Sequence, residues 1–529
     1  MTGPTVTGPT VTVARPGPTR AVQIGGHVYP VRLPTWRDPR LHLAAVITTL
    51  QVLGQVALGF ELSISQILAA ILTCAVIEVA VVFRREQVIA WPASAMLTGN
   101  GVAFVLRVSG TRHGDWWSTN GIGIFVATAA FALATKYLVR FRGAHVFNPS
   151  NIGLVVCFLL LGPSRVNPLD LWWGPLSPAL VVALTAIAVG AVAITVRLRM
   201  MGIVAGFWFT FAACIGVLAW SGHSMTARWH VGPVAGWSYW WILLTSPEIL
   251  VFCFFMITDP RTTPRGRVAR VAFGASVAVA ASVLVALQTT EFGVKVSILG
   301  ALASVCLLRP LLERWLPTPG LERDAPKAWV RDRIRGATAS PLRIAARLGA
   351  SVVLVLVLGV TLAALGTGAR AATVHRGDAR RPVVRGVAVP PVDVNTTNQV
   401  AAVTAAEARV MARDVVADLR IQTDALRGGD AALAATAGDR AWLVKLRRRI
   451  AHDGPDASEP AWRVKRITIS TARRPHQGPP AILATLRGQR VPPGAGRPRG
   501  VTTSFEIAWD GREYLLVSDD MPPGWTRPA

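Results

Sequence analysis

The chain has 529 residues, of which 52% are hydrophobic and only 16% are charged. Soluble proteins carry about a quarter charged residues, so the composition excludes an ordinary soluble protein and indicates a protein embedded in a membrane. The formal net charge of +26 comes mostly from arginine, which is typical of loops that face an anionic cytoplasmic leaflet. We therefore expect membrane lipids as partners and no nucleic acid.

The first 40 residues are rich in proline, glycine, threonine and arginine and begin with a near-repeat of TGPTV. They lack the apolar core of a cleavable signal peptide. We expect residues 1–40 to form a disordered tail, and the arginines of this tail place it in the cytoplasm.

Ten apolar runs follow, and a spanning helix needs about 20 apolar residues. They lie near residues 41–60, 63–83, 89–107, 121–139, 150–162, 178–196, 202–220, 238–257, 271–287 and 294–309. The run at 150–162 is too short to cross alone, and the run at 89–107 is interrupted by Pro92 and by TGNG at 98–101. We expect these two to be broken or re-entrant helices.

The loop charges orient these runs. If the runs cross alternately, several arginine-bearing loops share the side of the N-terminus; they hold Arg84 and Arg85, Arg140 and Arg142, Arg197 and Arg199, and Arg261 to Arg270. This predicts a multi-pass protein of the cell membrane with a cytoplasmic N-terminus. Ten spans divide into two sets of five, and an odd number per set requires any repeat to be inverted. The predicted fold class is a polytopic α-helical membrane protein with a ten-helix inverted-repeat bundle (5+5) over residues 41–309.

The remaining chain divides into three parts. Residues 310–347 read as a basic, partly helical cytoplasmic linker that lies on anionic headgroups, and residues 348–367 as one extra transmembrane helix. Residues 368–529 then form an extracytoplasmic linker and a small α+β domain, since helical spacing at 402–428 and 430–452 precedes alternating runs and a hairpin turn at Asp510-Gly511. We expect an NTF2-like domain that serves as a binding or assembly module.

Several ionisable side chains lie within the apolar runs or within a turn of their ends, at bilayer depth, where they are costly and usually face the bundle interior or a cavity. They are Glu78, Lys136, Glu248, Asp259, Glu291 and Lys295. For Glu78, Lys136 and Lys295 the alternative is contact with lipid headgroups. Glu248 follows Pro247, which frees a backbone carbonyl one turn earlier, so a cavity, a ligand or a neighbouring helix must supply a partner. We treat Glu78, Glu248, Glu291 and Lys295 as candidates for transport or coupling.

Two stretches concentrate hydrogen-bonding groups at the ends of apolar runs: FNPSNIG at 147–153 and FFMITDPRTTPRGR at 254–267. Asn148 and Pro149 suit a helix start, whose free N–H groups can bind an anion or the electron-rich edge of a ring; ordinary capping is the alternative. The charge count places both stretches on the cytoplasmic side. We therefore predict a shared pocket in which Thr258 and Asp259 lie opposite Asn148.

Together with SAMLTG at 94–99, these stretches resemble the three signature stretches of the NqrB/RnfD family in order and approximate spacing. This family contains membrane subunits of the sodium-pumping NADH:quinone reductase and of the Rnf complex. The resemblance covers roughly residues 40–310. Within the family, the chain is most similar to RnfD-like proteins of enediyne biosynthesis clusters (the UnbU type), which suggests a role in natural-product biosynthesis.

The resemblance implies a flavin cofactor and electron transfer coupled to ion movement. Family members attach FMN covalently through a threonine, but the matching stretch GPLSPAL at 174–180 has none. Covalent FMN is therefore not expected, and two alternatives stay open: FMN or riboflavin bound noncovalently, or no flavin at all. The residues able to bind a flavin are Thr98, Asn148, Asn151, Thr258 and Asp259, with Lys136 or Arg261 stabilising the anionic reduced ring.

The chain has no cysteine cluster for iron and sulfur and no nucleotide-binding glycine fingerprint. No catalytic or metal-binding residue is predicted. We therefore expect the chain to be at most one subunit of an oxidoreductase complex, with other membrane or redox subunits as partners. Two alternatives stay open. One is a transporter of a small solute or ion on the same fold, and the other is a membrane anchor that presents the C-terminal domain.

Overall fold

The computed structural model describes most of the chain and separates it into two compact units. The helical unit takes its residues from 1–217, 240–285 and 292–362, and the second unit from 218–239, 286–291 and 363–529. The described residues are 20–24, 26–169, 178–227, 233–316, 319, 324–335, 353, 355–366, 381, 382, 384, 386–395, 401, 403–472, 480–494, 496–509 and 513–521.

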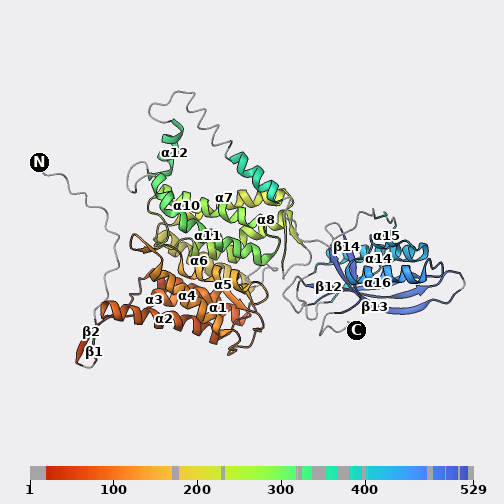
Figure 1. The fold of residues 1–529 in the computed structure, drawn as a ribbon, viewed down its shortest axis with the longest axis horizontal. Coiled ribbons are helices and arrows are strands. Elements are labelled where there is room, and N and C mark those ends of the chain that lie inside the picture. Colours follow the sequence, from red (N-terminus) through yellow and green to blue (C-terminus); the bar gives the residue numbers. More distant parts are fainter. Residues whose placement is uncertain are drawn as a thin grey trace. The chain divides into compact units, whose positions relative to one another are not determined.

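The helices between residues 39 and 315 follow the predicted runs closely (Figure 1). They are α1 (Pro39–Val56), α2 (Ile64–Glu86), α3 (Ala93–Val105), α4 (Ile122–Leu138), α5 (Pro149–Leu161), α6 (Pro178–Arg197), α7 (Met201–Trp220), α8 (Gly236–Thr245), α9 (Pro247–Val251), the π-helix η1 (Phe252–Met256), α10 (Arg267–Val285) and α11 (Glu291–Trp315). Among the described helices, six segments are long and apolar enough to cross a membrane: Ile64–Glu86, Pro178–Arg197, Met201–Trp220, Gly236–Met256, Arg267–Val285 and Glu291–Leu311. The chain is therefore a helical membrane protein.

Two of the remaining helices are short. Both α3 and α5 have 13 residues, and each is followed by a strand, β4 (Leu106–Val108) or β7 (Val166–Pro168). The two strands pair antiparallel, which satisfies backbone groups that the helices leave open. The predicted shortness of the run at 150–162 is confirmed.

The predicted interruption at TGNG is wrong, because α3 begins after Pro92 and continues through residues 98–101. The glycines serve packing. A Cβ atom at Gly99 would lie 2.4 Å from the carbonyl oxygen of Ala70 in α2, and one at Gly101 would lie 3.2 Å from Ser150 at the start of α5. Small residues let helix backbones approach closely, so these glycines bring α3 against α2 and α5.

A real break occurs in the segment Gly236–Met256. Helix α8 ends at Thr245, and α9 begins at Pro247 with Ser246 as its cap; the Ser246 hydroxyl accepts the Ile249 N–H at 3.1 Å. Proline cannot donate to the preceding turn, and the serine cap supplies a new helix start in its place. The π-helix η1 then brings the chain to Thr258 and Asp259.

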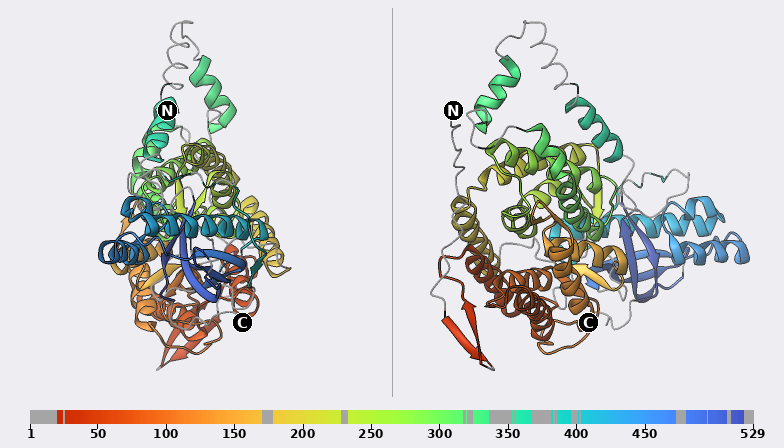
Figure 2. Two further views of the ribbon diagram at one scale, coloured as in Figure 1. Left: turned by 90° about the vertical axis from the view of Figure 1, so that its right-hand side faces the viewer. Right: turned by 60° about the vertical axis from the view of Figure 1, so that its left-hand side comes forward.

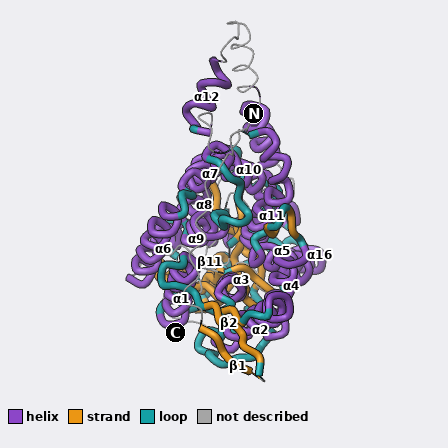
Figure 3. The backbone as a smooth tube through the Cα atoms, turned by 90° about the vertical axis from the view of Figure 1, so that its left-hand side faces the viewer, coloured by secondary structure: helices purple, strands orange, loops and turns teal. Residues whose placement is uncertain are grey.

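The prediction of a disordered tail is wrong for residues 20–32. Strands β1 (Arg20–Ile24) and β2 (His27–Arg32) form a hairpin beside α2, and β3 (Ile89–Ala90) pairs parallel with β2 (Figure 3). Contacts with α2 hold it: the Tyr29 and Phe83 rings lie 5.2 Å apart, and Arg32 Nη1 lies 2.9 Å from Glu86 Oε2. Residues 1–19 lie outside the described residues.

The predicted linker after the bundle is partly helical, as expected. Helix α11 runs to Trp315 rather than ending near 309, and α12 (Pro326–Arg335) lies within the predicted basic linker. The predicted helix at 348–367 is described as an apolar helix over Val355–Gly366.

The C-terminal part is an α+β domain, as predicted. Helices α14 (Ala405–Gly428), α15 (Ala431–Ala434) and α16 (Arg440–Asp453) precede most of a five-stranded sheet of order β10-β11-β12-β13-β14 (Figures 1 and 2). The strands are β10 (Val392–Val394), β11 (Ala461–Ala472), β12 (Ala481–Val491), β13 (Arg499–Trp509) and β14 (Tyr514–Ser518). Val415 and Leu419 of α14 pack with Ile467, Ile482 and Leu486 of the sheet.

One part of the predicted linker belongs to this sheet, because β10 pairs parallel with β11 at its edge. The other pairs in the sheet are antiparallel. The predicted turn at Asp510-Gly511 lies outside the described residues.

Candidate functional site: a pocket beside the start of helix α5

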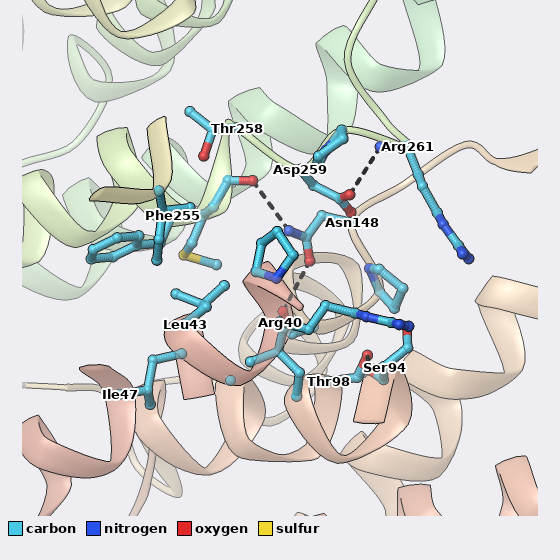
Figure 4. A pocket seen from close by; sticks show the side chains of 18 of the residues that line it. Arg40, Leu43, Ile47, Ser94, Thr98, Asn148, Phe255, Thr258, Asp259 and Arg261 are labelled. Atoms are coloured by element: carbon cyan, nitrogen blue, oxygen red, sulfur yellow. Dashed lines mark hydrogen bonds between the residues drawn. The ribbon is translucent and has the colours of Figure 1, made fainter. Parts of the chain in front are cut away.

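A pocket of about 320 Å³ lies in the helical unit where the first turns of α1 and α5 meet α3, η1 and the Thr258–Arg261 turn (Figure 4). It combines an apolar wall with a polar one. The apolar wall includes Leu43, Ile47, Leu97, Phe104, Ile194, Leu198, Phe255 and Met256. The polar wall includes Asp38, Arg40, Ser94, Thr98, Lys136, His145, Asn148, Ser150, Thr258, Asp259 and Arg261.

Asn148 stands at the centre of the polar wall, between Thr258 and Asp259 on one side and Thr98 and Ser94 on the other (Figure 4). As the cap of α5, its Oδ1 atom accepts the Asn151 N–H at 3.4 Å. Its Nδ2 atom donates to the carbonyl oxygen of Met256 at 3.1 Å. Asn148 therefore ties α5 to η1, and the predicted shared pocket is confirmed.

The Thr258–Arg261 turn is held by its own hydrogen bonds. The Thr258 hydroxyl donates to Phe254 O at 2.5 Å, and Asp259 Oδ1 accepts the Arg261 N–H at 3.0 Å. Asp259 Oδ2 lies 3.3 Å from Nε2 of His145, on β6 (Ala144–His145). Burial raises the pKa of Asp259, but His145 and Arg261 lower it more, so the pKa lies below its ordinary 3.8. Asp259 is therefore an anion at neutral pH.

Lys136 enters the pocket from α4, and its side chain is only 8% exposed. Its Nζ atom lies 2.5 Å from Glu78 Oε2 and 3.2 Å from the Ser94 hydroxyl. Glu78 also accepts a hydrogen bond from the Tyr137 hydroxyl at 2.7 Å. Lys136 and Glu78 thus form a buried ion pair beside the pocket, and the alternative of headgroup contact is wrong for both.

The structure brings six of the seven predicted flavin-binding residues to this pocket: Thr98, Lys136, Asn148, Thr258, Asp259 and Arg261. Asn151 is buried but lies outside the lining, and its Nδ2 atom donates to Leu299 O of α11 at 2.9 Å. Asn151 therefore fixes α5 against α11.

The four candidates for transport or coupling lie outside the lining. Glu248 Oε1 lies 3.0 Å from Lys295 Nζ, and both side chains are less than 15% exposed. Lys295 also donates to Leu169 O at 2.9 Å, so it is another ion-paired group rather than one that reaches for headgroups. Glu291 is buried in the first turn of α11.

Our sequence reasoning missed Asp38, Arg40 and His145. Arg40 forms a bidentate pair with Asp38, which caps α1 ahead of Pro39. The sequence signal was present, because Asp38-Pro39 repeats the polar-residue-then-proline pattern of Asn148-Pro149. His145 gave no comparable signal, since its partner Asp259 lies 114 residues away.

Neither the models of known protein families nor the curated protein sequences match this chain. Most of the stretch at 174–180, where we considered covalent flavin attachment, lies outside the described residues.

Proposed function

We propose that the chain is a membrane subunit for electron transfer that binds FMN or riboflavin noncovalently in the pocket beside α5. The observation that carries this proposal is the convergence of three sequence stretches, at 94–99, 147–153 and 254–264, on one cavity with an apolar wall and a polar wall. A planar, partly polar ring system needs both surfaces. The resemblance of the same stretches to the NqrB/RnfD family supports flavin as the ring.

The size and lining of the pocket suit the ring system. Small-molecule pockets have volumes of about 300–1,000 Å³, so a cavity of about 320 Å³ favours the ring inside with its side chain leaving through the rim. Leu43, Ile47 and Phe255 offer apolar contact, and the first turns of α1 and α5 present the positive ends of two helices.

The cations of the pocket have distinct roles in this proposal. A bound flavin would supply one- and two-electron chemistry. Arg261 is exposed at the rim, where it suits the phosphate of FMN. Lys136 Nζ, which pairs with Glu78, lines the pocket and would lie near negative charge on a bound ring. His145 Nε2, 3.3 Å from Asp259 Oδ2, fixes the position of this carboxylate at the polar wall.

We also propose the ten-helix inverted repeat, the cytoplasmic N-terminus and the extracytoplasmic C-terminal domain in the cell membrane. The arginine-bearing loops and the helices near ten predicted runs support this arrangement. The role in natural-product biosynthesis, the NTF2-like type of the C-terminal domain and the redox partner subunits are part of the same proposal.

The test is the cofactor content of the purified protein. We expect flavin absorbance, flavin released on denaturation, and no fluorescent band in a denaturing gel. Arg261→Gln should weaken FMN binding about tenfold, since a hydrogen bond to a charged group contributes about 1.5–3 kcal/mol, and should leave riboflavin binding unchanged. Arg265→Gln is the matched control, because Arg265 is equally exposed and does not line the pocket. A protein without flavin that binds neither compound would refute the proposal.

One observation favours a second function, transport of a small ion or solute. The buried pair of Glu248 and Lys295 lies at the break between α8 and α9, and broken helices with buried charges are typical of transporter binding sites. Flux into vesicles should then fall in Glu248→Gln and in Asp259→Asn. Unchanged flux in both variants would exclude a transport site at these positions.

A further inference from the structure

Helix α12 is anchored to the start of α10 by one buried carboxylate. Asp324 Oδ1 accepts the backbone N–H groups of Arg267 at 2.8 Å and Val268 at 3.2 Å. Asp324 is only 6% exposed, and it lies 57 residues from the helix start that it caps. Gly266 leaves room for this contact, since a Cβ atom there would lie 2.9 Å from Asp324 Oδ1.

This anchor defines where α12 lies with respect to a membrane. Helix α10 is one of the segments long and apolar enough to cross the bilayer, so its first residue lies near the boundary between lipid and water. Helix α12 begins at Pro326, two residues after Asp324, and must start at the same boundary.

The exposed side chains of α12 match such a position. Lys327 and Arg331 are exposed and one helical turn apart, on the same face. Val330, next to them, is 46% exposed. An exposed apolar residue between cations on a short helix is the pattern of interfacial helices that bind anionic lipid. Arg265 and Arg267, at the start of α10, are also exposed and extend the positive surface.

We infer that α12 is an interfacial helix that binds the phosphate groups of anionic phospholipids through Lys327 and Arg331. Val330 enters the upper acyl region, and Asp324 connects the lipid-bound helix to the first turn of α10. The positive charge of this surface and its attachment to the end of a spanning helix select lipid as the occupant. The inference is independent of the proposed flavin.

A fluorescent probe on α12 in the full-length protein tests this inference. All five native cysteines are buried, so Val330→Cys provides an accessible thiol for an environment-sensitive dye. We expect blue-shifted emission, and protection from an aqueous quencher, in vesicles of phosphatidylcholine mixed with phosphatidylglycerol. In pure phosphatidylcholine the dye should be exposed to water. The same emission in both lipids would overturn the inference.

Variants of the labelled protein identify the groups responsible. Lys327→Gln and Arg331→Gln together should abolish most of the lipid-dependent shift, since each cation near an anionic surface contributes a factor of about five in binding. Arg447→Gln with Arg448→Gln is the control, because these exposed cations lie on α16 of the C-terminal domain and should leave the shift intact. Equal effects of the two double variants would contradict the assignment.

Two further measurements test the anchoring role of Asp324 and distinguish lipid phosphate from free phosphate as the ligand. Asp324→Ala should loosen α12 from α10, seen as faster hydrogen exchange at the Arg267 and Val268 amides. Unchanged exchange there would refute the anchoring role. Inorganic phosphate added to phosphatidylcholine vesicles should not shift the emission. If it reproduced the shift, the surface would be a site for a free anion and the lipid assignment would be wrong.

Discussion

The helical unit and the C-terminal domain both bury charged side chains, but for different purposes. In the helical unit, Lys136 pairs with Glu78 and also lines a cavity, so the pair borders space that a ligand can enter. In the C-terminal domain, Asp418 is fully buried and pairs with Arg381 at 2.5 Å, and its second oxygen accepts a backbone N–H. The first arrangement leaves a charge available for function, whereas the second serves the fold.

The fold-serving role is visible at the edge of the sheet. Strand β14 has β13 as its partner on one side. On the other side, Asp414 Oδ2 accepts the Tyr514 N–H at 3.1 Å, and Asp418 Oδ2 accepts the Leu516 N–H at 3.3 Å. Two carboxylates of α14 thus bond to amides that an edge strand would otherwise offer to another chain. Burial alone therefore does not mark a charge as functional, whereas an adjoining cavity does.

The largest expected effect follows from removing Arg381. Arg381→Met removes the partner of Asp418, a carboxyl whose pKa burial already raises well above 3.8, and should lower the free energy of unfolding of the C-terminal domain by up to about 3–5 kcal/mol. Denaturant-dependent hydrogen exchange at the β14 amides measures this. Lys445→Met is the control, because its pair with Asp519 leaves Lys445 63% exposed and an exposed pair contributes at most about 1 kcal/mol. A loss equal to that of the control would contradict the fold-serving role.

Removing the cation of the Lys136–Glu78 pair beside the pocket should also destabilise the protein, but by less. Lys136→Met leaves the buried carboxylate of Glu78 without its ion-pair partner, although Glu78 keeps its hydrogen bond from Tyr137. The variant should destabilise the helical unit by about 3 kcal/mol. The double variant with Glu78→Gln should be more stable than Lys136→Met alone, because no charge is then stranded. Thermal unfolding in detergent compares the variants. If the stability lost in the double variant equalled the sum of the losses in the two single variants, the two residues would not act as a pair.

The close contact of α3 with α2 gives the next largest effect. Gly99→Ala places a methyl group 2.4 Å from Ala70 O and should destabilise the helical unit by about 1–3 kcal/mol, as overpacking does. Gly300→Ala is the matched control, since Gly300 lies within α11 with open space at the Cβ position. That variant should be neutral or stabilising, since alanine is the better helix former. Thermal unfolding in one detergent compares the melting temperatures of the two variants. Equal melting temperatures would contradict the close contact at Gly99.

The smallest effect is a pH dependence at Asp259. The pKa of this carboxyl is lowered below 3.8 by His145 and Arg261, against burial, so its contribution to stability is present above pH 3.8 and is lost as the pH falls through the lowered value. Asp259→Asn should therefore make the melting temperature less dependent on pH in that acid range. An identical acid profile for the variant would contradict the lowered pKa.

The sequence predicted the helices of the membrane part well, because long apolar runs and proline-led starts such as Asn148-Pro149 are local signals. It also predicted that Asn148 and Thr258 share a pocket, since loop charges place both helix ends on one side. The sequence was misleading where contacts between distant residues outweigh local composition. Residues 20–32 have the composition of a disordered tail, but they form a hairpin that Tyr29 and Arg32 hold against α2. His145 and Asp324 could not be assigned partners, because those partners lie 114 and 57 residues away.

The most direct test of the proposed function is a titration of flavin onto the purified, cofactor-stripped protein. Flavin fluorescence should be quenched at a one-to-one ratio in the wild type. Lys136→Met, which removes a cation from the pocket lining, should bind more weakly, whereas Lys295→Met, at a buried ion pair outside the lining, should bind normally if it folds. The absence of saturable quenching in the folded wild type, or equal loss in both variants, would contradict a flavin site in this pocket.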